Sequence, residues 1–301
     1  MGRVQIDEAT KLKRSIFAFG LTAWMMLICF GYYYKAVVCG STHLMGLRSV
    51  CFTIVHGVDL NHWFETLIYV PVIWLALYQV HRIVFARSEA ELANDPRHRM
   101  KSLVGSFAIA MWLYGAGIHI TNLVEIWARE HNNVSSGTVY ELVYFLDETF
   151  SHYFQFIAFF FAIGWFICHD RLGRTEGARF ALFMGLAHGV ERAVGTIEGS
   201  SAHLLLPLVA WIALACWWRL RRYQGRWRDA WSDYFFRYGV GFSLSAPLAQ
   251  GLYYLLFGGF VQPSEMGSDA VWVFVFTLTY MVILASFFLI LDARLKGQPA
   301  K

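Results

Sequence analysis

Charged residues are scarce in this chain. Only 15% of its 301 residues are Asp, Glu, Lys or Arg, and 57% are hydrophobic. Long apolar stretches recur along the whole length, and no soluble core needs that many, so the composition excludes an ordinary soluble domain. Walker loops, GxGxxG loops and GxSxG-type elbows are absent as well. The common loop motifs of nucleotide binding and serine hydrolysis therefore support neither function.

Cysteine is also rare. The chain has five cysteines, and none forms a CxxC pair or a Cys/His zinc-finger spacing, which excludes a structural zinc site of that kind. Cys39 and Cys51 fall in one predicted external loop, where an oxidising compartment permits a disulfide. Two free thiols fit the sequence equally well. No cleavable signal peptide is predicted, because the first apolar run is too long and no A-x-A-like site follows it.

Long apolar runs are what the chain has in abundance. About 20 apolar residues suffice for a helix to cross the hydrocarbon core of a bilayer. Eight runs are that long: roughly 15–38, 65–85, 102–128, 139–168, 179–198, 203–222, 234–257 and 270–292. The sequence therefore predicts an all-α, multi-pass membrane protein in which one domain, residues 1–301, forms a bundle of about eight transmembrane helices.

Positive charge alternates with these runs along the chain. Of the 25 Lys and Arg, 21 lie in five segments: 1–15, 81–101, 170–179, 219–237 and 292–301. By the positive-inside rule both termini are cytoplasmic, which requires an even number of crossings and agrees with eight. The formal charge of +4 then reflects orientation in a plasma or inner membrane, and nucleic-acid binding is not indicated.

The same pattern assigns the loops. It predicts an external loop at 39–65 and cytoplasmic loops at 86–101, 169–179 and 219–234. The last of these contains RLRRYQGRWR (219–228), a juxtamembrane basic loop that faces anionic lipid. Membrane lipids are thus the first partners that the sequence predicts.

Ionisable side chains concentrate in the third, fourth and fifth predicted spans. The topology places all of them at middle or outer depths: His119, Asn122, Asp147, Glu148, His152, His188, Glu191, Arg192 and Glu198. A charge at the bilayer centre costs about 2.5–3.5 kcal/mol on insertion scales, so such residues are paired or functional. Three consecutive spans that deliver ionisable groups at one depth predict a buried site.

Helical spacing refines this site. Glu148 and His152 are four apart and share a face, whereas Asp147 is about 140° away from His152 on an α-helix. Gly185, Gly189 and Gly195 are expected to let a neighbouring backbone approach closely.

A metal ion is the ligand that these residue types fit best. Neutral imidazoles from separate helices and a carboxylate form a three- or four-ligand site, and metal binding offsets their desolvation. We expect His119, His152 and His188 as ligands of zinc, with Asp147 or Glu148 as fourth ligand or as the base that positions a water molecule.

Other polar residues receive supporting roles. Glu191 and Glu198 are candidates for fixing an imidazole tautomer, and Asn122 and Gln250 for lining the cavity. Arg192 is expected to pair with Asp147 or Glu198. The external residues His56, Asp59 and His62 form a weaker cluster, more typical of a solvated loop. Three histidines on the cytoplasmic side are excluded from the site: His81, His98 and His169.

Several alternatives stay open. Copper or iron in place of zinc would make the protein an oxygenase or oxidase acting on an apolar substrate, and two of the histidines could bind haem. A proton-coupled transporter would use the same residues as a relay, although no internal repeat supports it. A structural subunit that packs against partners in a membrane complex is also compatible with the aromatic-rich later spans.

Three short segments resemble one family of intramembrane zinc hydrolases, the alkaline ceramidase and adiponectin-receptor superfamily. They are GAGIHITN (115–122), YFLDETFSHY (144–153) and GLAHGVERAVGTIEG (185–199). The resemblance implies His119 as first ligand, Asp147 as the acid that positions water, and His188 as a late ligand. The family's serine four residues before the first histidine is Gly115 here, and its late His-x-x-x-His is absent. The resemblance implies hydrolysis of an amide or ester in a lipid-like substrate.

Overall fold

The computed structural model describes most of the chain. The described residues are 10–20, 54–55, 58–59, 63, 65–85, 96–131, 134–170, 178–263 and 266, with scattered positions between 272 and 290. Most of the first and last predicted spans, and the loop with Cys39 and Cys51, lie outside these ranges.

Nearly all the described residues are helical. Residues 10–20 form a helix, and β1 (Ile54–Val55) and β2 (Val58–Asp59) pair antiparallel in a minimal hairpin. The remaining elements follow in chain order: η4 (Glu65–Tyr69), α4 (Val70–Phe85), α6 (Pro96–Ile118), α7 (Thr121–Ile126), η5 (Trp127–His131), α8 (Thr138–Tyr144), η6 (Phe145–Ser151), α9 (His152–His169), α10 (Ala178–Glu198), η7 (Ala202–Leu204), α11 (Leu205–Arg222), α12 (Trp227–Ala230) and α13 (Tyr234–Phe257).

Five helical segments are long and apolar enough to cross a membrane. They are Thr66–Phe85, Pro96–Arg129, Thr138–His169, Ala202–Arg222 and Tyr234–Phe257. Each coincides with a predicted span, so the all-helical class is confirmed, and the five helices are compatible with a multi-pass membrane protein. The predicted span 179–198 is helical as α10 but is not one of the five, because glycines and charged residues lower its hydropathy.

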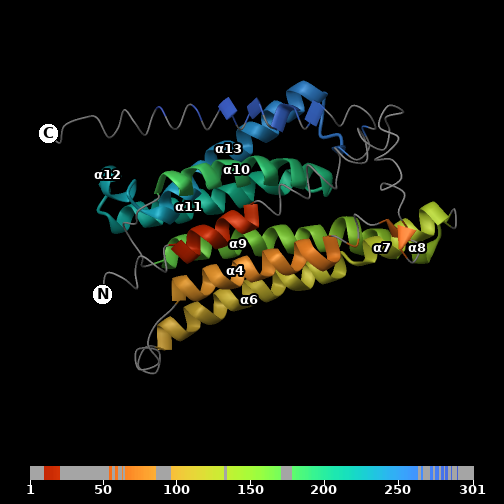
Figure 1. Ribbon diagram of the computed structural model, residues 1–301, viewed down its shortest axis with the longest axis horizontal. Helices are drawn as coiled ribbons and strands as arrows, with labels where there is room; N and C mark the ends of the chain where they lie inside the picture. Colours follow the sequence, from red (N-terminus) through yellow and green to blue (C-terminus); the bar gives the residue numbers. More distant parts are fainter. Residues whose placement is uncertain are drawn as a thin grey trace.

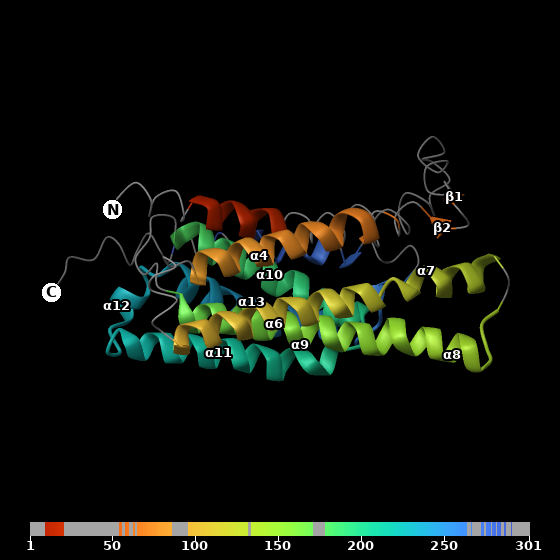
Figure 2. The same ribbon diagram turned by 90° about the horizontal axis from the view of Figure 1, so that it is seen from below.

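The helices pack into one elongated bundle (Figures 1 and 2). In Figure 1, α10, α11 and α13 lie on one side and α4, α6 and α9 on the other, and α9 contacts α11. The helix of residues 10–20 connects the two sides. Its Phe19 stacks on Phe159 of α9, with ring centroids 5.1 Å apart, and meets His188 of α10 edge-on at 4.6 Å.

α10 is the most deeply buried of the long helices in the described chain, and α13 is its main neighbour. A Cβ on Gly185 would lie 2.9 Å from the backbone carbonyl carbon of Tyr238, and a Cβ on Gly189 would lie 2.9 Å from the carbonyl oxygen of Phe242. The close approach predicted for these two glycines is confirmed. At Gly195 it is wrong, because the nearest atom to a Cβ there is 3.8 Å away.

A buried arginine closes the end of the bundle near α12. Arg219 donates to the carboxylates of Asp170 (2.8 Å) and Asp233 (2.9 Å), which follow α9 and precede α13. Tyr223 also donates to Asp233 at 2.7 Å, while the other oxygen of Asp233 caps α13 by accepting from Phe236 N. Burial and this bond to Asp233 raise the pKa of Tyr223 to about 12, so its hydroxyl stays protonated at neutral pH.

Candidate functional site

His119 and Asp147 form the centre of a polar cluster at the end of the bundle opposite α12. His119 lies just after α6, and its Nδ1 is 2.5 Å from Oδ1 of Asp147 in η6. The Asp147 side chain is fully buried, and its Oδ2 has no hydrogen-bond partner among the described residues. Ser151 places its Oγ 3.4 Å from the same Nδ1, and its hydroxyl donates to the backbone oxygen of Asp147.

A π-helical turn brings these residues together. The sequence predicted Asp147 and His152 on different faces because an α-helix separates residues five apart. η6 is π-helical from Phe145 to Ser151, and π-helical hydrogen bonds join residues five apart, so such residues align. Asp147 and His152 therefore both face His119. The ring centroids of His119 and His152 are 4.7 Å apart.

The hydrogen bonds of the two histidines decide which nitrogen keeps a lone pair. A backbone carbonyl can only accept, so Nδ1 of His152 carries a proton and donates to Glu148 O at 2.9 Å. The Ser151 hydroxyl is already donated to Asp147 O, so in the contact between Ser151 Oγ and Nδ1 of His119 the imidazole is the donor, and the Asp147 carboxylate lies 2.5 Å from the same nitrogen. In a neutral imidazole with its proton on Nδ1, the lone pair is on Nε2.

More carboxylates surround this pair. The half-buried Glu148 interacts electrostatically with Asp147, His119, Glu198 and Glu125. Glu125 was not predicted as a site residue. It is buried, accepts a hydrogen bond from Tyr140, and pairs with Arg129 at 3.1 Å. Its position in a short helix among apolar residues was the signal that could have identified it.

His188 lies far from the polar cluster of His119 and His152. A Cβ on Gly199, at the end of α10, would lie 2.9 Å from Cγ of His152, so Gly199 marks the level of the cluster. His188 is eleven residues earlier, about 16 Å away along the helix at 1.5 Å per residue. Two histidine ligands of one zinc must each lie about 2 Å from it. In this structure His188 therefore cannot share a metal ion with His152.

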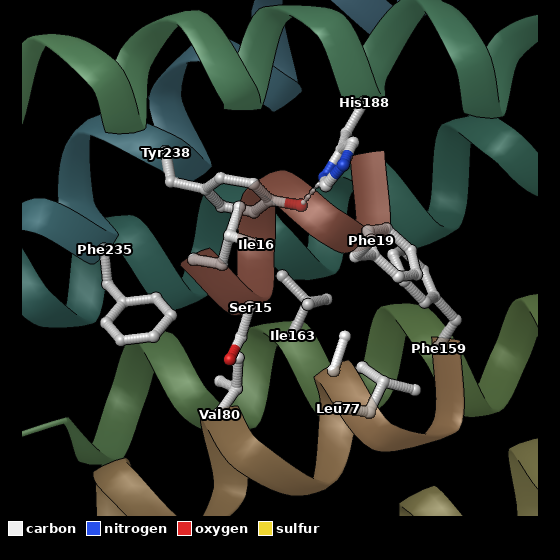
Figure 3. A pocket seen from close by; sticks show the side chains of 11 residues that line it. Ser15, Ile16, Phe19, Leu77, Val80, Phe159, Ile163, His188, Phe235 and Tyr238 are labelled. Carbon is white, nitrogen blue, oxygen red and sulfur yellow. Dashed lines mark hydrogen bonds between the residues drawn. The ribbon is translucent and has the colours of Figure 1, made fainter. Parts of the chain in front are cut away.

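The surroundings of His188 are apolar. Figure 3 shows its imidazole beside a small cavity, with the Tyr238 hydroxyl 2.9 Å from its Nδ1. Phe19, Leu77 and Phe159 contribute to the lining. Nε2 of His188 is buried without a hydrogen-bond partner among the described residues. The His–Tyr pair joins α10 to α13 in the core and is separate from the polar cluster.

Arg192 has a structural role, although not with the partners that the sequence predicted. It donates to Glu191 at 2.6 Å and to the hydroxyl of Tyr69 at 3.2 Å. Its guanidinium carbon also lies 4.9 Å from the ring centroid of Phe159. The pair explains how two charges are accommodated inside a buried helix.

Of the remaining predicted residues, Asn122 and Glu198 lie at the polar end of the bundle, and Gln250 has a structural contact. Asn122 and His119 line a small pocket together with Thr66 and Val70 of the η4–α4 segment. Glu198 belongs to the polar end, where its backbone oxygen accepts from Gln262 at 2.6 Å. Gln250 donates to the backbone of Ala202 at 2.7 Å and so has a structural partner.

The histidines excluded by the sequence lie at the other end of the bundle. His81 bonds to Ser102 O, His98 to Phe85 O, and His169 to Trp165 O. The side chains of His56, Asp59 and His62 lie outside the described residues.

Within the described part of the chain, no three His, Cys, Asp or Glu side chains converge closely enough to hold a metal ion. The three-histidine site is therefore not assembled here, and the pair of His119 and His152 with its carboxylates is what the fold brings together.

The comparisons with known proteins find no match. No family model matches the chain, no curated protein matches it, and no solved structure matches its fold.

Proposed function

We propose that this protein is a multi-pass membrane enzyme that binds a metal ion at His119 and His152 and hydrolyses an amide or ester bond in a lipid-like substrate. The single observation that carries the proposal is the close approach of the two imidazoles, whose ring centroids are 4.7 Å apart, beside the buried carboxylate of Asp147, which lies 2.5 Å from Nδ1 of His119. We assign the proton of each ring to Nδ1, which in His152 donates to Glu148 O.

The roles of the carboxylates follow from their positions. Asp147 lies on the Nδ1 side of His119, where it holds the ring and raises its basicity, as carboxylates behind metal-bound histidines do. Glu148 is half-buried, so its carboxylate is the better candidate for the base that accepts a proton from water. The metal, which we propose to be zinc, would lower the pKa of a bound water molecule.

The membrane setting supports a lipid-like substrate. The cluster lies on helices long and apolar enough to cross a bilayer, and the exposed side chains near it include Val124, Trp127, Leu142 and Phe145. We propose eight crossings with both termini cytoplasmic, which puts the cluster in the outer half of the membrane.

Metal content of the purified protein tests this proposal. Plasma mass spectrometry of the detergent-solubilised chain should find about one zinc per chain. His119→Ala and His152→Ala should each remove most of it. His188→Ala and His203→Ala should retain it, because His188 lies in the apolar core and the exposed His203 bonds to Tyr153.

Hydrolysis is tested separately on fluorogenic lipid amides and esters. Glu148→Gln should abolish turnover while the zinc content falls less than in the histidine variants. Copper or iron in place of zinc would overturn the hydrolase in favour of an oxidase. Full metal content in both His119→Ala and His152→Ala would show that the site is elsewhere.

A further inference from the structure

Arginines at the α12 end of the bundle divide into two kinds. Arg219 is buried and bonded to two aspartates. Three others, Arg221, Arg222 and Arg228, are exposed and form no ion pair with any described residue. Arg226 is likewise exposed but pairs with Asp229 at 3.2 Å. Three cations without a carboxylate partner among the described residues thus stand at the end of α11 and in α12, on either side of one short turn.

The turn that carries these arginines is firmly built. After α11, Gly225 N donates to Leu220 O at 3.2 Å, and Gln224 N donates to Arg221 O at 2.9 Å. Gln224 and Gly225 have positive φ of 55° and 74°, as a helix-terminating turn requires. Tyr223 and Arg219 both bind Asp233, which directly precedes α13. These bonds fix the turn against the bundle. The backbone that carries the exposed arginines is therefore fixed before any ligand arrives.

Tryptophans show the depth of the loop in the membrane. Trp217 and Trp218 are about half exposed on the last turns of α11, and Trp227 is half exposed at the start of α12. Exposed tryptophans near the end of a membrane-crossing helix mark the level of the lipid headgroups. Arg221 lies over the ring of Trp217, with 3.9 Å from its guanidinium carbon to the ring centroid. The backbone of Arg221 lies about 6 Å along the helix beyond that of Trp217, and its guanidinium folds back over the ring.

We infer that this loop is a binding site for anionic phospholipid headgroups. Guanidinium groups bind phosphate oxygens through paired hydrogen bonds, and the tryptophans contact the adjacent glycerol and acyl region. Each basic residue at a membrane surface contributes roughly a fivefold preference for anionic lipid. The loop should thus bind phosphatidylglycerol more tightly than phosphatidylcholine.

Native mass spectrometry of the full chain tests this inference. The delipidated protein is titrated with phosphatidylglycerol or phosphatidylcholine of identical acyl chains, and bound lipids are counted. The wild type should prefer phosphatidylglycerol by about tenfold or more. The variant Arg221→Gln/Arg222→Gln/Arg228→Gln should lose most of that preference, and the preference should weaken as salt is raised.

A matched control removes the same charge elsewhere. Arg14, Arg97 and Arg99 are exposed on the helix of residues 10–20 and on α6, and their triple substitution to Gln should leave the preference intact. Equal loss in both triple variants would show a general charge effect and overturn the site. Equal binding of the two lipids by the wild type would overturn it as well. Circular dichroism and the melting temperature check that both variants keep the fold, which is expected because the clamp residue Arg219 is unchanged.

Discussion

At the scale of single residues, the decisive contact is the one between His119 and Asp147. The Asp147 carboxylate is fully buried, and its Oδ1 lies 2.5 Å from Nδ1 of His119. A buried carboxylate without such a partner would be costly. The contact therefore gives the buried carboxylate a polar neighbour and places it against Nδ1 of His119.

Asp147→Asn tests this role. The amide has nearly the same shape, but its NH₂ group would donate to Nδ1 and move the ring proton to Nε2. We expect the affinity for zinc to fall about 10- to 100-fold, the effect typical of a lost carboxylate behind a metal-bound histidine. Competition with a chelator measures it.

Ser151→Ala is the comparison for this substitution, because it keeps the carboxylate and removes the Oγ that lies 3.4 Å from the same Nδ1, so it measures the part of the effect that belongs to the hydroxyl. Unchanged affinity in Asp147→Asn would contradict the tautomer argument.

At the scale of elements, α10 explains why the fifth predicted span carries so many polar residues. A helix that faces lipid must be apolar, whereas a helix surrounded by other helices can bury a charge pair if the pair is complete. α10 is enclosed by its neighbours, and Arg192 and Glu191 neutralise each other inside it. Its glycines let α13 approach to backbone contact, which supplies the packing that holds membrane helices together.

Gly185→Ala measures the importance of this packing. The added methyl would overlap the backbone carbonyl of Tyr238, which cannot rotate away as a side chain can, so one helix must shift. We expect a loss of about 1–3 kcal/mol in unfolding free energy. Thermal or denaturant unfolding in detergent detects it.

Gly195→Ala on the same helix is the matched control. The nearest atom to the new methyl is 3.8 Å away, and alanine is the better helix former by about 1 kcal/mol. This variant should be as stable as the wild type or more so. Equal destabilisation by both substitutions would refute the close-packing argument.

At the scale of the whole molecule, the two ends of the bundle differ in chemistry. The end with α7 and α8 gathers His119, His152 and the acidic residues, whereas the end with α12 carries exposed arginines and the Arg219 clamp. In Figure 1 these ends lie at opposite extremes of the long axis. Such polarity is expected of a bundle whose two ends face different compartments.

Labelling of single cysteines tests this arrangement. On a background with the five natural cysteines replaced by alanine, Gln224→Cys and Ser136→Cys place thiols in exposed loops at the two ends. In intact cells a membrane-impermeant maleimide should label Ser136→Cys only, and Gln224→Cys should react only after permeabilisation. Labelling of both in intact cells, or the reverse pattern, would contradict the predicted orientation.

The sequence by itself determined the class of the molecule. Runs of about 20 apolar residues leave little choice but helices in a membrane, because an unpaired backbone group in hydrocarbon is too costly. It also indicated His119, Asp147 and His152 as candidate site residues, since ionisable residues within apolar spans are rare enough to stand out. Their separation from His81 and His169 followed from the positions of these residues along the spans.

Only the tertiary structure decided which of these residues meet. His188 was grouped with the others by its predicted depth and by the family resemblance, yet rise along α10 places it about 16 Å from the level of His152. The separation of Asp147 from His152 that α-helical spacing predicts was wrong, because the π-helical turn of η6 is not encoded in any simple periodicity. Arg192 was paired with distant acids, whereas its neighbour Glu191 binds it. Spacing fixes which residues share a helix face, but helix packing fixes which faces touch.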